Sequence, residues 1–189
     1  MHQFKKGIKI IGIACSSFNR TKDQEVAVIG AIYRGASLFE GMIKTAVQVD
    51  GEEATDKIAD MIKNSTHWQQ LKVIMTRGVT IAGFNCLSLK QLSELTSLPV
   101  ISIVDRKPDM DSIKSALQNL PNSKERFQIL EENGLPIQMI SSPEKEPVFV
   151  QFYSLTEEEV KQIITNATIV GRIPEPLRVA RLIAVGLTD

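Results

Sequence analysis

Apolar residues follow two patterns along this chain: short, nearly continuous runs, and longer stretches with a helical period. The runs at residues 8–14, 71–75 and 98–104 are rich in β-branched side chains, which predicts strands buried on both faces. Glu25–Arg34 and residues 38–49 also predict strands, and the three residues between them suit a hairpin turn. Three consecutive strands are therefore expected first, the last two of them antiparallel.

The helical period begins after residue 51, where Ala54, Ile58 and Met61 fall on one face of a helix that runs to about residue 64. Further helices are predicted at residues 89–95 with Ser88 as the cap, at 109–120, at 124–133, at 156–167 and from 173 onwards. A strand pair at residues 135–140 and 148–152 is predicted around an exposed loop at 141–147. This order predicts a mixed sheet that becomes parallel in its second half.

Composition narrows the class of protein to which the chain can belong. The 189 residues are 43% hydrophobic and carry 22 basic and 22 acidic side chains, so a single soluble domain over residues 1–189 is expected. Zero net charge gives no bulk attraction to polyanions, so nucleic-acid binding would need a local basic patch. Cys15 and Cys86 are expected as buried reduced thiols in a cytoplasmic protein, and no targeting or membrane segment is evident.

The stretch at residues 71–89 is the first place to look for function. A buried strand there runs into a glycine-bearing turn at 77–85, and the carboxyl ends of central strands are where ligands collect in α/β proteins. The turn offers Arg77 and Asn85 instead of carboxylates, and Arg77 is as compatible with a solvated side chain as with a phosphate contact. Asp50 can simply turn the chain and bond helix amides, and Glu53 can favour the first helical turn.

Four segments resemble the signatures of a known family: residues 49–55, 78–85, 98–101 with 107–109, and 173–180. In order and register, they are similar to a largely archaeal family, number ninety-nine among the domains of unknown function, which is itself similar to endonuclease V. The resemblance implies a ribonuclease H-like fold: a mixed five-stranded central sheet, antiparallel in its first three strands and then parallel, flanked by helices, with a C-terminal strand pair and helices. It also implies ancestry in metal-dependent nucleic-acid cleavage, including cleavage at deaminated bases.

The chain departs from that family where the chemistry would reside. Family members usually show an acidic pair after the first strand, where this chain reads Gly-Ile-Ala-Cys-Ser-Ser-Phe at residues 12–18. They often show an aspartate where Arg77 stands and another near the position of Ser88. Only Asp50 and Glu53 remain as weak catalytic or metal-ligand candidates, and a guanidinium repels a divalent cation. The inherited hydrolytic centre is therefore predicted to be dead or severely weakened.

Two hypotheses from different classes follow. The first is a catalytically inactive domain that binds nucleic acid or a protein partner and needs no cofactor; its nucleic-acid contacts would be Arg77, Arg34, Arg106 and Asn85. The second is an active, Mg²⁺-dependent endonuclease acting on DNA or RNA with deaminated bases; its ligands would be Asp50 and Glu53 with Asp105 or Glu175. A purely structural subunit stays open as a third reading. An edge strand or the last helix could also join two copies of the chain.

Overall fold

The computed structural model describes residues 7–140 and 146–187. Its strands are β1 Lys9–Cys15, β2 Glu25–Arg34, β3 Leu38–Gln48, β4 Leu71–Thr76, β5 Thr80–Ile81, β6 Asn85–Cys86, β7 Val100–Val104, β8 Ile137–Met139 and β9 Val148–Tyr153. Its helices are α1 Ala54–Lys63, the 3-10 turn η1 Trp68–Gln70, α2 Leu89–Thr96, α3 Met110–Leu117, α4 Ser123–Glu132, α5 Glu157–Ala167 and α6 Glu175–Gly186. All the long strands and helices expected from the hydrophobic pattern are present, with ends shifted by a few residues.

The main sheet has seven strands within the described residues, in the order β3-β2-β1-β4-β7-β9-β8. The pairs β1–β2 and β2–β3 are antiparallel and the pairs β1–β4 and β4–β7 are parallel, as expected. The expectation of a five-stranded sheet with a separate strand pair was wrong, because β9 pairs antiparallel with β7 and carries β8 with it. Burying Val148 and Val150 of β9 against the core favours this extension.

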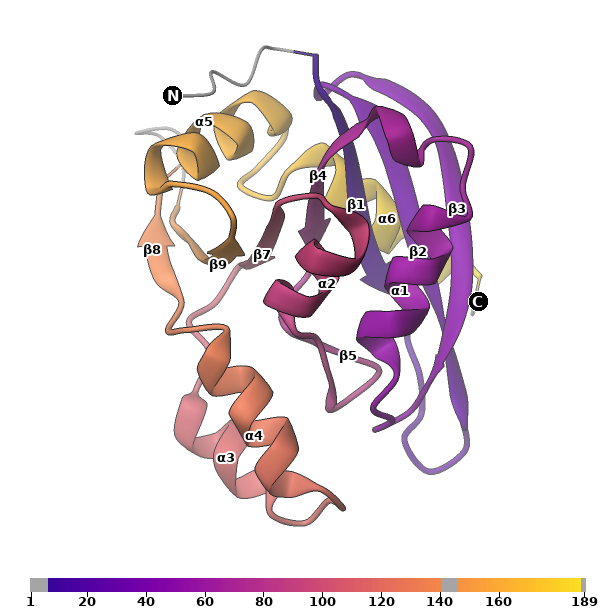
Figure 1. Ribbon diagram of the computed structural model, residues 1–189, viewed down its shortest axis with the longest axis vertical. Coiled ribbons are helices and arrows are strands. Elements are labelled where there is room, and N and C mark those ends of the chain that lie inside the picture. Colours follow the sequence, from indigo (N-terminus) through magenta and orange to yellow (C-terminus); the bar gives the residue numbers. More distant parts are fainter. Residues whose placement is uncertain (1–6, 141–145, 188–189) are drawn as a thin grey trace.

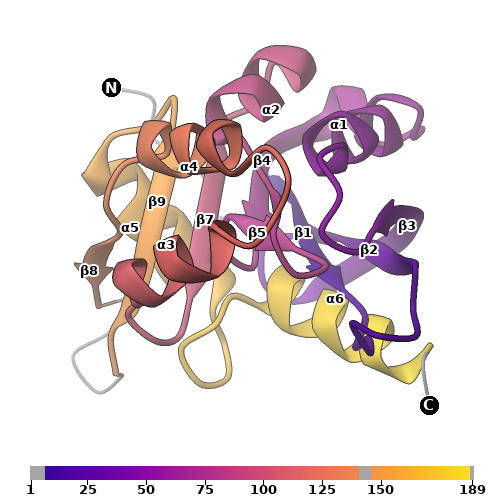
Figure 2. The ribbon, with the colours of Figure 1, turned by 90° about the horizontal axis from the view of Figure 1, so that it is seen from below.

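Helices cover both faces of the sheet, as Figure 2 shows. One core joins α1 and α2 to the face that carries Ile11 and Ile74, and a second joins α5 and α6 to the face that carries Ile10 and Val73. This alternation explains why β1 reads as a continuous apolar run, since successive side chains enter opposite cores. In the part of the chain that the structure describes, no helix is long and apolar enough to cross a bilayer.

Helix α6 packs directly on β1 through Gly12. A Cβ atom at residue 12 would overlap the backbone of Pro176 and lie 2.5 Å from the backbone N of Leu177. Glycine is therefore needed for the helix to approach the strand this closely. The close approach carries α6 towards the carboxyl end of β1.

The connection from β4 to α2 contains a short hairpin that the sequence did not predict. Strands β5 and β6 pair over two residues each, too few to give an alternating pattern. Ser88 caps α2 as predicted, since its Oγ accepts from the backbone N–H of Gln91 at 3.1 Å. Helices α3 and α4 lie beyond the carboxyl ends of β4 and β7, at the lower end of Figure 1. The loop predicted at residues 141–147 falls mostly on 141–145, outside the described residues.

Candidate functional site

Parallel strands β1, β4 and β7 end at one edge of the sheet, and loops at such an edge commonly form binding sites. Arg77 follows β4, and its guanidinium lies 3.5 Å from the carboxylate of Asp105, which follows β7. Arg106 is exposed beside Asp105 in the sequence. Arg181 of α6 reaches the same edge and donates to the carbonyl of Cys15 at 2.7 Å. Two of the predicted contacts, Arg77 and Arg106, thus share this edge, and Arg181 joins them although the sequence did not single it out.

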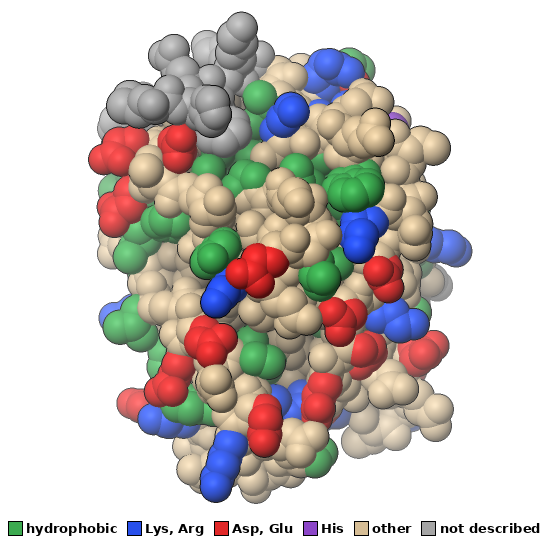
Figure 3. All heavy atoms as spheres, in the orientation of Figure 1, with side chains coloured by type: hydrophobic (Ala, Val, Ile, Leu, Met, Phe, Trp, Pro, Cys, Tyr) green, Lys and Arg blue, Asp and Glu red, His purple; other side chains and the backbone are tan. Residues whose placement is uncertain are grey.

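The ion pair between Arg77 and Asp105 is weak. The two side chains are 35% and 40% exposed, and exposed pairs of this kind contribute about 0–1 kcal/mol. On the face seen in Figure 3, acidic and basic side chains lie interspersed. Arg77 can therefore exchange its carboxylate partner for another anion at little cost.

The carboxylate of Asp50 is bound by two N–H donors. Its Oδ1 accepts from Arg20 Nη2 and from the backbone N–H of Phe84, both at 2.8 Å. The expectation that Asp50 bonds amides of its own helix was wrong, because its partner is the β5–β6 hairpin. Asp50 has a left-handed backbone, φ 53°, which turns its side chain away from α1 and towards that hairpin.

The carboxylate of Glu53 is also bound by N–H donors. Oε1 accepts from the backbone N–H of Gln48 at 2.6 Å, and Oε2 accepts from Glu52 N at 2.9 Å and Asn85 Nδ2 at 3.2 Å. Burial alone would raise the pKa of Glu53, but these hydrogen bonds outweigh it and hold the pKa below its usual value. Glu53 is thus an ionised carboxylate already surrounded by donors.

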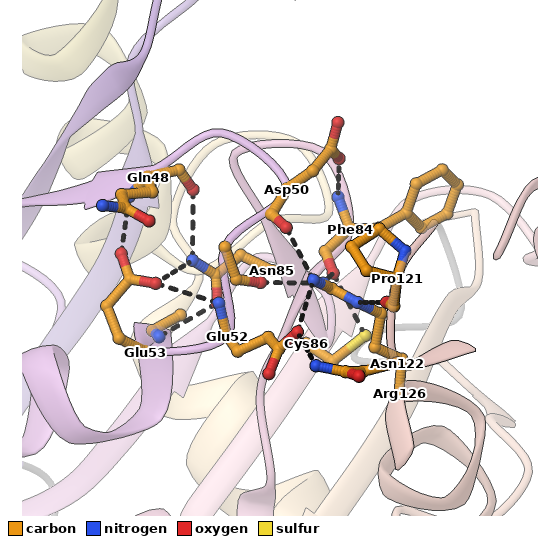
Figure 4. Close-up of polar contacts among 12 residues, drawn as sticks. Gln48, Asp50, Glu52, Glu53, Phe84, Asn85, Cys86, Pro121, Asn122 and Arg126 are labelled. Atoms are coloured by element: carbon orange, nitrogen blue, oxygen red, sulfur yellow. Dashed lines mark hydrogen bonds and ion pairs between the residues drawn. The ribbon is translucent and has the colours of Figure 1, made fainter. Parts of the chain in front are cut away.

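Asn85 has no exposed surface. Its Oδ1 accepts from the backbone N–H of Ala54 at 3.0 Å, and its Nδ2 donates to the carbonyl of Gln48 at 3.1 Å as well as to Glu53. The side chain joins the β3–α1 connection to the β5–β6 hairpin (Figure 4) and touches no solvent. Asn85 therefore holds these two connections together, and its side chain is not exposed to a ligand.

Arg126 of α4 is a second residue that the sequence did not single out. It is 3% exposed, and its guanidinium lies among the backbone carbonyls of Asp50, Gly51 and Phe84 (Figure 4). An arginine in an amphipathic helix is expected to be exposed to solvent. No local pattern therefore distinguishes Arg126 from an ordinary surface arginine. Only the packing of α4 against the carboxyl edge brings its head group to the carbonyls of two distant loops.

Arg34 lies at the other end of the sheet. It ends β2 opposite Lys9, the first residue of β1, whereas Arg77 follows the last residue of β4. Its Nε donates to Glu40 at 2.6 Å, and Glu40 also pairs with Lys9 at 2.5 Å. The structure therefore does not bring Arg34 together with Arg77 and Arg106.

Glu175, the remaining acidic candidate, is buried and paired within α6. Its Oε2 accepts from Arg178 at 2.6 Å, and its Oε1 accepts from the backbone N–H of Val170 at 3.2 Å. Burial alone would raise the pKa of Glu175, but the guanidinium of Arg178 and the backbone donors hold it below the usual value. Of the two arrangements considered for Glu175 and Arg178, pairing with each other is the one observed.

The cysteines are free thiols in the structure. Cys86 is buried, and burial raises the pKa of its thiol to about 11, so it stays protonated at neutral pH. Cys15 is half-buried at the end of β1. The expectation that Cys86 is a buried small hydrophobe is confirmed.

Metal ligands do not gather in the described part of the chain. Over residues 7–140 and 146–187, no group of three or more His, Cys, Asp or Glu side chains could hold a metal ion. A hollow of about 630 Å³ opens beside Asp50 and Arg20 and is also lined by Asp23 and Glu25. Its lining carries more acidic than basic groups, so a polyanion is not favoured there.

The family model for endonuclease dU matches residues 6–188 of the chain. A UPF0215 protein of Methanopyrus kandleri is 38% identical over 189 residues, covering 100% of this chain and 95% of the relative. These comparisons support the archaeal family resemblance, but they do not give the number ninety-nine that the sequence suggested.

Two solved structures are similar. A protein of unknown function from Archaeoglobus fulgidus is 31% identical with a TM-score of 0.85, covering 95% of this chain and 97% of that one. Ciona intestinalis endonuclease V, solved with a DNA containing an inosine, is 15% identical with a TM-score of 0.59, covering 93% of this chain and 83% of that one. The second likeness shows a shared fold only. By the match along nearly its whole length and by its archaeal relatives, the chain belongs to the endonuclease dU family.

Proposed function

We propose that this chain is a nucleic-acid-binding protein of the endonuclease dU family whose hydrolytic centre is lost. The observation that carries the proposal is the state of Asp50 and Glu53. The bonded oxygen of Asp50 and both oxygens of Glu53 accept from N–H donors. A metal ion would have to displace several of these bonds to be held there.

The ends of the central strands support the same conclusion. Phosphodiester hydrolysis by metal ions needs carboxylates that hold the ion against the phosphate and a nucleophilic water. At the end of β1 this chain has Ala14, Cys15 and Ser16, and after β4 it has Arg77. A guanidinium at this place opposes a divalent cation and suits a phosphate oxygen.

The contacts proposed for nucleic acid are Arg77, Arg106 and Arg181, all at the carboxyl edge. Arg34 is left out because it lies at the opposite end of β1, and Asn85 because it is buried. The likeness in fold to an endonuclease V that was solved with DNA makes nucleic acid the ligand to test first.

A fluorescence-anisotropy titration with labelled oligonucleotides tests the binding. Arg77→Gln is expected to weaken binding and to lower the slope of log Kd against log salt by about 0.7–0.9, the value for one lost phosphate contact. Lys72→Gln is the matched control, because Lys72 is exposed near the amino end of the same strand and the charge change is identical. Equal affinities for wild type and Arg77→Gln would remove Arg77 from the interface.

A second candidate, an active metal-dependent endonuclease, is favoured by the description of the matching family as endonuclease dU. It is tested by incubating DNA and RNA that contain uracil or hypoxanthine with the protein and Mg²⁺ or Mn²⁺. We expect no cleavage. The informative variants are Asp50→Asn and Glu53→Gln, since the amides keep an acceptor oxygen but lose the charge that a metal requires. Cleavage by wild type that both variants lose would establish the nuclease and reject the proposal.

A further inference from the structure

Arg126 has every N–H of its guanidinium bonded. Arginine has five N–H donors, and the structure shows five acceptors. Nε donates to Pro121 O at 3.0 Å; Nη1 donates to Gly51 O at 2.7 Å and Phe84 O at 2.6 Å; Nη2 donates to Asp50 O at 2.7 Å and Glu52 Oε1 at 3.1 Å. The side chain is 3% exposed, so the group is removed from water and fully satisfied inside the protein.

The acceptors make an environment built for a cation. Four of them are backbone carbonyls, and the fifth is the carboxylate of Glu52, which is itself 50% exposed. Converging carbonyl and carboxylate oxygens are the ligands that hard cations take in proteins. Here the positive charge that they surround is supplied by a side chain of α4.

The loops held by this charge have an unusual backbone. Asp50 and Ala82 both have left-handed conformations, with φ values of 53° and 49°. Non-glycine residues in this conformation are strained and persist only where the surroundings hold them. Arg126 binds the carbonyls of Asp50 and Phe84, and the carboxylate of Asp50 in turn binds the N–H of Phe84 and Arg20.

We propose that Arg126 is a built-in cation that holds the β3–α1 connection and the β5–β6 hairpin in register and thereby positions Asp50 and Arg20 beside the carboxyl edge. It is a positioning residue and touches no ligand itself. The consequence for ligand binding rests on the proposed function, whereas the cation role does not. Helix α4 becomes the element that sets the geometry of two loops distant from it in the sequence.

A cation site differs from an ordinary buried hydrogen bond in one testable way: it should accept a free ion of the same shape. Arg126→Ala is expected to lower the Tm by about 10 °C, because four carbonyls lose their partner inside the protein. Millimolar guanidinium chloride, well below denaturing concentrations, should restore most of that loss with a saturable dependence, whereas NaCl at the same ionic strength should not.

Two variants control this experiment. Arg172→Ala removes an arginine that pairs with Glu146 at 2.6 Å at a partly exposed position, and it should show no saturable rescue. Arg126→Lys keeps the charge but not the planar fork, and it should stay less stable than the rescued alanine variant. Equal rescue of Arg172→Ala, no rescue of Arg126→Ala, or full stability of Arg126→Lys would each overturn the proposal.

A measurement on the intact protein stands even if Arg126→Ala fails to fold. The Nη protons of Arg126 should exchange slowly with water and give separate NMR signals, while those of Arg172 should be averaged by rotation and exchange. Averaged signals from Arg126 would overturn the proposal that its guanidinium is held as a built-in cation.

Oligonucleotide affinity then tests whether the loops held by Arg126 affect nucleic-acid binding. Because the β5–β6 hairpin that Arg126 holds begins three residues after Arg77, Arg126→Ala should bind about tenfold more weakly than wild type and recover with guanidinium, measured against NaCl at equal ionic strength. Rescue of the Tm with unchanged affinity throughout would overturn the positioning role. If wild type binds no oligonucleotide, the proposed function fails, and the rescue of the Tm still decides the cation role by itself.

Discussion

Replacing Asn85 by alanine removes a buried side chain that bonds two backbone groups. The variant leaves the buried N–H of Ala54 without its bond of 3.0 Å, whereas the carbonyl of Gln48 still accepts from the backbone N–H of Gly51 at 3.1 Å. A buried group left unsatisfied costs about 1–3 kcal/mol, so a loss of about 2 kcal/mol in the free energy of unfolding is expected. That is a large share of the roughly 5–15 kcal/mol by which proteins are stable.

Urea unfolding followed by the fluorescence of the single tryptophan, Trp68, measures this loss. With a slope near 2 kcal/mol per molar urea, the midpoint should fall by about 1 M. Asn119→Ala is the control, because Asn119 is exposed and its contact to Ser115 O is 3.4 Å; its midpoint should hardly move. If Asn85→Ala loses no more stability than Asn119→Ala, Asn85 does not organise the site and its role as a ligand contact has to be reopened.

Other substitutions test separate parts of the structure. Gly12→Ala should destabilise the protein by about 3 kcal/mol in thermal unfolding, because its Cβ would overlap the backbone of Pro176. A loss no larger than that of an ordinary surface substitution would refute the close packing of α6 on β1. Glu175 has a lowered pKa, so its stabilisation is present above its usual pKa of 4.5 and is lost as the pH falls through the lower folded value. The Tm difference between wild type and Glu175→Gln should therefore be largest near pH 7 and shrink below pH 4.5; a difference that grows on acidification would contradict the pairing with Arg178. Ser88→Ala should cost about 1 kcal/mol through the lost helix cap, measured by urea unfolding, and no change would show that the cap is dispensable.

The β4–α2 connection shows how far local patterns reach. The strand, the glycine turn and the cap at Ser88 follow from apolar runs and capping chemistry, which act within a few residues. The β5–β6 hairpin inside the turn has two-residue strands that local propensity cannot signal. Its form depends on bonds from Asp50 and Arg126, which lie far away in the sequence.

The main sheet gives a similar contrast. The sequence predicted β8 and β9 as a strand pair around a loop, but it did not predict that β9 pairs with β7, because the residues of an apolar strand do not specify which sheet edge it joins. Arg34 and Arg77 look equivalent as arginines after strands, yet the antiparallel return of β2 sends Arg34 to the opposite end of the sheet. The sequence gives the sign of each charge, whereas the direction of the strands determines where each charge lies.

By itself, the sequence determined the long strands and helices, the antiparallel start and parallel continuation of the sheet, the family resemblance, and the absence of acidic residues from residues 71–89. These depend on residue type and on spacing along the chain. The tertiary structure decided the use of the side chains that remain: Asp50 and Glu53 are bound by N–H donors, Asn85 is buried, and Arg126 supplies an internal positive charge. The physical reason is that hydrogen-bond partners and burial are properties of segments brought together by folding, and no single segment carries them alone.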